Sequence, residues 1–207
     1  YTVLRSRGFE ADDIAYLREV LPGDPPPLPD VSFLPPTPAV LQERIEVWAR
    51  DKMLASPAPL YLILIDHGSP GIFHLDIGGT PQQEAVTSAQ LAQWLHVLET
   101  SLHTKAVDGS DGSVGWAGWD ATAKNAKAAL DQDIVVVYGA CYSGSFIPAL
   151  SRPGRVLITS AAAHEVSYRG VLNHMTGVRD GEFFTMELFR NLGAGRSLKD
   201  AFELACF

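Results

Sequence analysis

Three short runs of apolar residues predict buried β-strands. Residues 60–65 are almost continuously apolar, residues 133–138 are rich in valine, and residues 155–160 carry the third run. Strands that are buried on both faces lack the alternation of apolar and polar positions that a half-exposed sheet shows. The pattern therefore predicts a mostly parallel sheet, with the strand over residues 60–65 at its centre.

Apolar residues at helical spacing predict helices around these strands. Thr37 followed by Pro38 is typical of a helix N-terminus and predicts a helix over residues 38–54. Ser88 is expected to cap a second helix. The further helices are expected over residues 88–102, 121–130, 181–192 and 197–207. Strands that alternate with helices predict an α/β fold, built as a single domain over residues 1–207.

The remaining segments are predicted to be short elements and connections. Residues 1–7 resemble the end of a helix, residues 14–17 a short strand, and residues 72–75 part of a small hairpin. Residues 21–36 are dense in proline, which fixes φ and removes hydrogen-bond donors, so we expect an extended surface connector there. Residues 104–120 are predicted to form a mobile loop, because they are rich in glycine and serine.

The composition narrows the class of protein. The 207 residues are 46% hydrophobic and 19% charged, with a mean hydropathy of +0.05, as in a globular chain. A net charge of −8 disfavours nucleic acid as the main partner, because phosphate binding needs a basic face. Two cysteines cannot make a disulfide framework or a cysteine-based zinc site. No apolar run approaches the roughly 20 residues of a membrane helix.

A histidine and a cysteine follow two of the predicted strands. His67 comes after the first strand and Cys141 after the second, and each lies close to glycine. The carboxyl ends of parallel strands share one edge of a sheet, where ligands bind. A thiol needs a base or an electropositive neighbour to ionise near neutral pH, and an imidazole commonly serves. The two residues together predict a nucleophilic cysteine with a histidine base, in the order that caspases use.

Backbone N–H groups beside this pair are candidates for an oxyanion hole. The N–H of Gly68 and that of Cys141, at the expected start of a helix, could hold a developing negative charge. The alternative is that Gly68 and Gly139 only permit tight turns.

Other chemistries fit the sequence less well. Gly139-x-Cys141-x-Ser143 resembles a nucleophile elbow, which would make the chain a cysteine-dependent hydrolase of small esters or lactones with His164 or His174 as base. The six histidines show no metal-binding helical pair, so no metal site is predicted. Residues 108–112 have the composition of a calcium loop without its spacing.

Three stretches of the sequence resemble the legumain family of cysteine peptidases, in the caspase-like superfamily. They are Asp66-His-Gly-Ser-Pro-Gly-Ile72, Gly139-Ala-Cys-Tyr-Ser-Gly-Ser145 and Thr159-Ser-Ala-Ala-Ala-His-Glu-Val-Ser-Tyr168. The resemblance implies a caspase-like three-layer α/β sandwich, a His67/Cys141 dyad, hydrolysis of peptide bonds and no cofactor. It also implies a strand and an Asn-bearing loop before Tyr1, so we expect the chain to lack its N-terminal strand.

The resemblance implies a substrate pocket, in which this chain differs from legumains at two positions. The implied substrate-binding residues are Asp66, Gly139, Ser160, Ser167, Tyr168 and Glu182. Legumains carry an acidic residue where this chain has Gly139, and a serine where it has Val166, so asparaginyl specificity is not carried over. Glu182 falls near another pocket acid and would favour a basic or amide side chain at P1, the substrate residue before the cleaved bond. The alternative is a solvated glutamate in the first turn of a helix.

The expected partner is a peptide or protein substrate, without nucleic acid and without a membrane span. A catalytically silent peptide-binding module with the same fold is the alternative from another functional class. The resemblance favours a secreted or extracytoplasmic location, whereas the absence of paired cysteines permits a cytoplasmic one.

Overall fold

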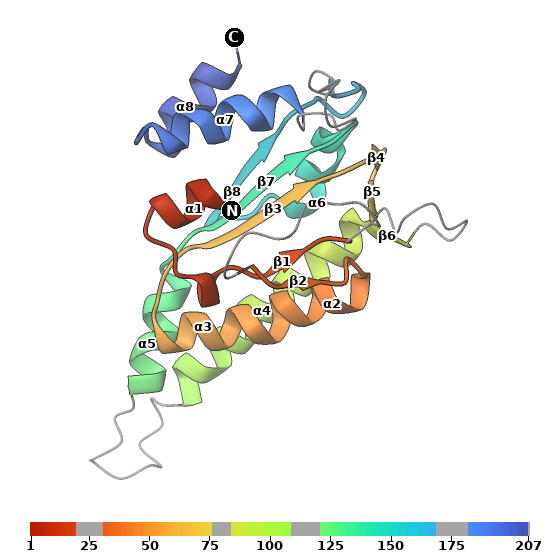
Figure 1. Ribbon diagram of the computed structural model, residues 1–207. Coiled ribbons are helices and arrows are strands. Elements are labelled where there is room, and N and C mark those ends of the chain that lie inside the picture. The colour runs from red at the N-terminus through yellow and green to blue at the C-terminus, as the bar shows by residue number, and fades with distance from the viewer. Residues whose placement is uncertain (20–30, 76–83, 109–120, 169–181, 207) are drawn as a thin grey trace.

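The computed structural model describes residues 1–19, 31–75, 84–108, 121–168 and 182–206. Its central layer is a three-stranded parallel sheet in the order β3-β7-β8, formed by β3 (Leu60–Ile65), β7 (Ile134–Gly139) and β8 (Arg155–Thr159) (Figure 1). Leu60 pairs with Ile134 and Ile65 pairs with Gly139, so β3 and β7 begin and end together. The three predicted strands are confirmed.

The prediction that the strand over residues 60–65 lies at the centre of the sheet is wrong. β7 is the central strand and is buried along its whole length, whereas β3 pairs only with β7 among the described strands. On β3, Tyr61 is 39% exposed and Ile65 is 47% exposed. The apolar run of β3 resembles that of a fully buried strand because one face packs into the core and the other is only partly covered.

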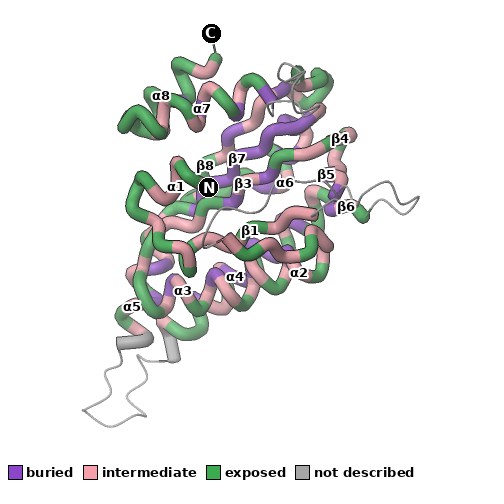
Figure 2. The backbone as a smooth tube through the Cα atoms, viewed as in Figure 1, coloured by how far each residue is buried: buried purple, intermediate pink, exposed green. Residues whose placement is uncertain are grey.

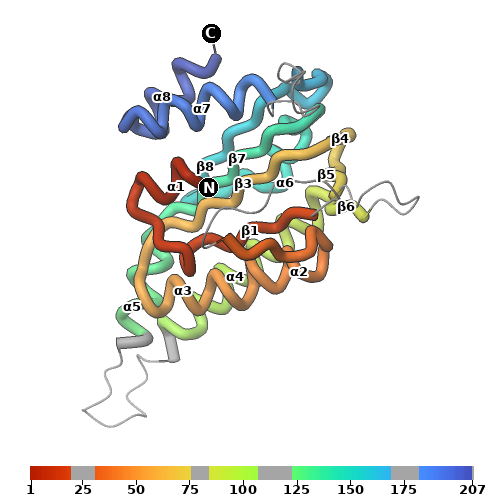
Figure 3. Tube along the Cα trace, in the orientation of Figure 1, coloured from red at the N-terminus to blue at the C-terminus, as the bar shows by residue number. Residues whose placement is uncertain are grey.

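Helices cover both faces of the sheet and give the predicted three-layer α/β sandwich (Figures 1 and 3). The strand period of two sorts the residues of β7 between the layers. Ile134, Val136 and Tyr138 join the larger core, and Val135 and Val137 join the smaller one. The predicted fold class, a caspase-like sandwich with a mostly parallel sheet, is therefore confirmed.

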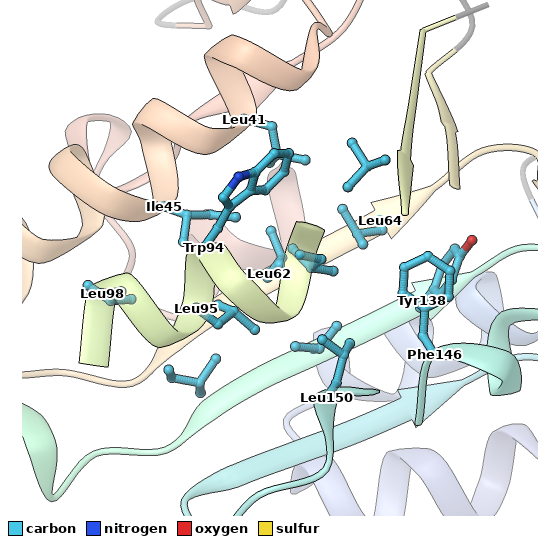
Figure 4. Packing of buried hydrophobic residues seen from close by; sticks show 14 of the residues in the cluster. Leu41, Ile45, Leu62, Leu64, Trp94, Leu95, Leu98, Tyr138, Phe146 and Leu150 are labelled. Atoms are coloured by element: carbon cyan, nitrogen blue, oxygen red, sulfur yellow. The ribbon is translucent and has the colours of Figure 1, made fainter. Parts of the chain in front are cut away.

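One layer is built from the helices between residues 38 and 150. They are α2 (Pro38–Glu43), the π-helical turn η2 (Arg44–Ala49), α3 (Arg50–Ala55), α4 (Ser88–Asp108), α5 (Ala121–Leu130), the 3₁₀ turn η3 (Ser143–Phe146) and α6 (Ile147–Leu150). Figure 4 shows apolar side chains from α2, η2, α4, η3 and α6 packed together with those of β3 and β7. Leu91, Leu95 and Leu98 of α4 are fully buried, and each contributes about 1.5–3 kcal/mol by leaving water.

The other layer comes from the two ends of the chain. It consists of α1 (Thr2–Ser6), α7 (Phe183–Gly193) and α8 (Leu198–Ala205), with α1 packed against α7. Leu188 of α7 and Ala201 of α8 are fully buried in the smaller core. The predicted helices at both ends of the chain are confirmed within the described residues.

The predicted start of the helix after Thr37 is confirmed, whereas the predicted cap and end of α4 are not. Thr37 Oγ1 accepts a hydrogen bond from the Val40 N–H at 3.3 Å, which confirms the predicted start of the helix that spans α2, η2 and α3. Helix α4 is capped by Thr87, whose Oγ1 accepts from the Gln90 N–H, and not by Ser88. It also continues to Asp108, so the first residues of the predicted loop over 104–120 are helical.

Two smaller sheets flank the central one. β1 (Tyr16–Leu17) and β2 (Phe33–Leu34) pair in parallel, so the end of the predicted proline-rich connector contributes a short strand. β4 (Gly68–Ser69), β5 (Ile72–Leu75) and β6 (Glu84–Thr87) form an antiparallel sheet that includes the predicted hairpin. A 3₁₀ turn, η1 (Ala11–Asp13), precedes β1.

Some predictions fall on residues outside the description. They concern most of the proline-rich segment (20–30), most of the glycine-rich loop (109–120) and His174, within 169–181.

Figure 2 shows burial concentrated on β7 and on the inner sides of the helices. No helix in the described ranges is both long enough and apolar enough to cross a bilayer.

Candidate active site

His67 and Cys141 lie at the same edge of the central sheet. Ile65 pairs with Gly139, and each of the two candidate residues follows its paired strand end by two positions. The loops also touch, because a Cβ added to Gly68 would overlap the carbonyl oxygen of Cys141. The absence of a side chain at Gly68 therefore permits a close approach between the histidine-bearing and cysteine-bearing loops, rather than only a tight turn.

The Cys141 side chain is half-buried against the loop that follows β8. Its Sγ lies 3.8 Å from Ser167 Oγ and 3.9 Å from the Ser167 carbonyl oxygen. Among the described residues, the Cys141 N–H donates no hydrogen bond. The next residue, Tyr142, has a left-handed backbone with φ of 57°, which is uncommon for a residue with a side chain. Such local strain is typical of functional sites.

Cys141 lies in a turn, two residues before η3, and not at the first turn of an α-helix as predicted. The segment after it is a four-residue 3₁₀ turn that leads into the four-residue α6. Elements this short do not carry the dipole of a full helix, so the expected helix-dipole contribution at the Cys141 N–H is small.

His67 is exposed, and its backbone is fixed on both sides. Its N–H donates to Asp66 Oδ1 at 2.7 Å, and its carbonyl accepts from the His74 N–H at 3.0 Å. In an antiparallel pair, hydrogen-bonded and non-hydrogen-bonded residue pairs alternate. Since His67 bonds with His74, the next pair, Gly68 and Phe73, is of the non-hydrogen-bonded kind. The Gly68 N–H therefore points away from β5.

The loop that carries Cys141 is fixed by residues 160–167. The Ala140 N–H donates to Ser160 Oγ at 3.2 Å, and the Tyr142 N–H donates to the Glu165 carbonyl at 2.7 Å. Ser143 is fully buried, and its Oγ donates to the Ala161 carbonyl at 3.2 Å. A Cβ added to Gly144 would lie within 3.0 Å of the backbone of residues 161–163, so this close approach requires glycine at position 144.

Glu182 is buried beside Gly139, so the solvated alternative predicted for this glutamate is wrong. Glu182 is 6% exposed, and its Oε2 accepts from the Thr185 N–H at 3.0 Å as the N-cap of α7. A Cβ added to Gly139 would overlap Thr185 Cγ2 and would lie 3.2 Å from Glu182 Oε2. The start of α7 thus occupies the space that a side chain at position 139 would need.

Tyr138 supports the two loops from inside the sheet. Its ring contacts those of Phe73 and Phe146 edge to face, and its hydroxyl donates to the Ile72 carbonyl at 3.4 Å. Burial raises the pKa of the Tyr138 phenol well above its ordinary value, and the charges of Asp66 and Cys141 raise it further. The phenol is therefore neutral and serves as a hydrogen-bond donor.

The structure brings together much of the predicted set. Ser167 lies against the Cys141 thiol, Ser160 binds the residue before the cysteine, and Gly139 contacts Glu182. Tyr168 is 73% exposed, and its carbonyl accepts from the Phe183 N–H at the start of α7. His164, the base of the elbow alternative, is exposed on the loop after β8.

Sequence reasoning missed Thr185 and Ser145. Thr185 fills the space beside Gly139, and Ser145 joins the Cys141 loop to the turn between β4 and β5. Ser145 belongs to the motif around Cys141, so its place in the sequence could have identified it, whereas no local sequence pattern identifies Thr185. Within the described ranges, no three His, Cys, Asp or Glu side chains gather as a metal site would require.

The fold and this edge define a class of protein: a caspase-like α/β sandwich with a cysteine and a histidine on adjoining loops. The family model described as the Peptidase C13 family, which is the legumain family, matches residues 119–205. This match confirms the resemblance to legumain-like cysteine peptidases and supports a cysteine-type peptidase that acts on protein substrates. The matched range contains Cys141 and Glu182 and begins after His67. No curated protein matches the chain.

Proposed function

We propose that the protein is a cysteine endopeptidase in which His67 is the general base and Cys141 is the nucleophile. The observation that carries the proposal is the contact of the two loops at Gly68 and Cys141, beyond strand ends that pair in register. The imidazole takes the thiol proton, and the thiolate attacks the scissile carbonyl carbon. The histidine returns the proton to the leaving amine, which leaves an acyl-enzyme on Cys141 Sγ.

The oxyanion of the tetrahedral intermediate is held by backbone N–H groups of Gly68 and Cys141. Two observations support this assignment. The Gly68 N–H points away from β5, and the Cys141 N–H donates to no described acceptor. Two fixed donors at an oxyanion lower the barrier without reorganisation during the reaction, and removing one such donor typically costs about 100-fold or more in rate.

The acyl-enzyme has two fates. Water attacks the thioester carbonyl in hydrolysis, with His67 accepting its proton, and Cys141 leaves as the thiolate. A peptide amine that attacks in place of water forms a new peptide bond, so the same intermediate also permits transpeptidation. The exposure of His67 is consistent with the approach of either nucleophile.

Glu182 is the residue that selects the P1 side chain in this proposal. Its carboxylate is buried next to Gly139, two residues before the nucleophile. A buried carboxylate binds a guanidinium, ammonium or amide group through charge-assisted hydrogen bonds, so we expect P1 arginine, lysine or an amide residue. Asp66, Ser160, Ser167 and Tyr168 are assigned to the remaining substrate contacts, on segments that border Cys141.

Incubation with a mixture of synthetic peptides, followed by mass spectrometry of the products, tests the proposal. We expect cleavage after a restricted set of P1 residues by a Cys206→Ser variant, and a loss of at least about 1000-fold when Cys141→Ala or His67→Ala is added. Cleavage that survives Cys141→Ala would overturn the proposal. Loss with His164→Ala but not with His67→Ala would instead favour the elbow arrangement, and peptide binding without turnover the silent module.

A further inference from the structure

One hydroxyl group joins the cysteine-bearing loop to the histidine-bearing one. Ser145 Oγ donates to the Tyr142 carbonyl at 2.6 Å and accepts from the Gly71 N–H at 2.8 Å. A serine hydroxyl has one proton and free lone pairs, so both bonds form at once. Gly71 lies in the turn between β4 and β5, three residues after Gly68, and is 74 residues from Ser145 in the chain.

The Ser145 hydroxyl is not needed to close the turn that contains it. The Ser145 N–H already donates to the Tyr142 carbonyl at 2.9 Å, which closes the turn by backbone bonding alone. What the Oγ adds is an acceptor for an N–H on the other loop. Ser145 is half-buried, so water competes weakly for this acceptor.

Both residues that the hydroxyl joins have a left-handed backbone. Tyr142, directly after the nucleophile, has φ of 57°, and Gly71 has φ of 72°. The Gly71 carbonyl is also used, because it accepts from the Ser88 N–H at the start of α4 at 3.0 Å. The turn between β4 and β5 is therefore held between α4 on one side and the Cys141 loop on the other.

We propose that Ser145 is a positioning residue that sets the separation of His67 and Cys141. This inference rests on the proposed function, since it concerns the geometry of the same dyad. Ser145 acts through the backbone of Gly71 and Tyr142 and touches neither substrate nor the reacting atoms. Without its hydroxyl, the β4–β5 turn loses its hydrogen bond to the cysteine loop, and the imidazole and thiol are held less closely.

Four variants in a Cys206→Ser background test this inference. Ser145→Ala removes the hydroxyl. Ser145→Thr keeps a hydroxyl and Ser145→Val lacks one, and their side chains are nearly isosteric with each other. The comparison of Thr with Val therefore remains informative where Ser145→Ala does not fold. Ser101→Ala is the matched control, because Ser101 Oγ makes a comparable bond to the Leu98 carbonyl on α4. The readouts are the rate of Cys141 alkylation by iodoacetamide as a function of pH and the exchange rate of the Gly71 amide.

We expect Ser145→Ala and Ser145→Val to slow alkylation at pH 6 by about tenfold, as a shift of one unit in the pH profile requires. The Gly71 amide should exchange faster in both, while Ser145→Thr and Ser101→Ala follow the parent protein. Profiles of the Ala and Val variants that match the parent, or a Thr variant that behaves like Val, would overturn the proposed role of Ser145 and leave the dyad intact. A parent profile that His67→Ala leaves unchanged would overturn the dyad, and this inference with it.

Discussion

At the residue scale, the candidate active site depends on the absence of a side chain at Gly68. Gly68 lies so close to the Cys141 carbonyl that any Cβ would overlap it, and the Ala140 Cβ and the Tyr138 hydroxyl oxygen lie 3.1 Å from the same point. The backbone on one side and a buried ring on the other leave no direction in which a small adjustment would relieve the overlap. A side chain at this position must therefore separate the two loops.

Gly68→Ala is predicted to reduce peptide cleavage by about 100-fold, because displacements near 1 Å at a reacting centre have effects of that size. Gly193→Ala is the matched control, since its Cβ would meet only the Val3 side chain at 3.4 Å. Cleavage rates and circular dichroism of both variants give the comparison. A Gly68→Ala protein that folds and retains full activity would show that the contact between the loops has no role in catalysis.

Single residues differ in how well the sequence predicts them. His67 and Cys141 could be chosen because each follows a recognisable buried strand, and the strand ends then share one edge. The pairing of Gly139 with Thr185 and Glu182 could not be predicted, because it depends on how α7 lies against the end of β7. No local pattern in the sequence fixes that packing.

At the scale of elements, the start of α7 combines two roles in one residue. Glu182 Oε2 caps the helix through the Thr185 N–H, and the Thr185 hydroxyl donates back to the Glu182 carbonyl at 2.9 Å. The same carboxylate is the proposed P1 acid. The two roles separate by chemistry, because a cap needs only an acceptor oxygen, whereas recognition of a cationic side chain needs the negative charge.

Glu182→Gln is therefore expected to retain stability within about 0.5 kcal/mol while it weakens cleavage after arginine or lysine relative to amide residues. Glu182→Ala removes the acceptor and should lower the free energy of unfolding by about 1 kcal/mol as well. Urea denaturation measures the first effect, and competition between matched P1 peptides measures the second. An unchanged P1 preference in Glu182→Gln would remove Glu182 from the pocket and leave it as a helix cap.

Elements were predicted best where burial fixes their pattern. β7, with every residue buried, and the helix that Thr37 caps have the predicted boundaries to within about a residue. β3 was placed wrongly in the sheet because its apolar run does not reveal which neighbours cover each face. The extension of α4 to Asp108 was missed because Leu102 is the last leucine of its apolar stripe and a run rich in glycine and serine begins at Gly109.

At the scale of the whole molecule, the three layers bring distant segments to one edge. The parallel pairing of β3 with β7 and of β7 with β8 places the loops after residues 65, 139 and 159 side by side. The sequence predicted this arrangement, since parallel strands with helical connections share their carboxyl edge. It did not predict β4, which directly follows His67, or the hydrogen bond from the His74 N–H on β5 that fixes the His67 carbonyl, because β4 has only two residues.

In the proposed mechanism His67 activates Cys141, and the rate of Cys141 alkylation as a function of pH measures that activation. The comparison is between the chain and its His67→Ala variant, both with Cys206→Ser so that one thiol reports. We predict that alkylation of the chain persists well below pH 8 and falls sharply in the variant. Alkylation that declines below about pH 8.5 in both proteins alike, as for an ordinary cysteine, would contradict the claim.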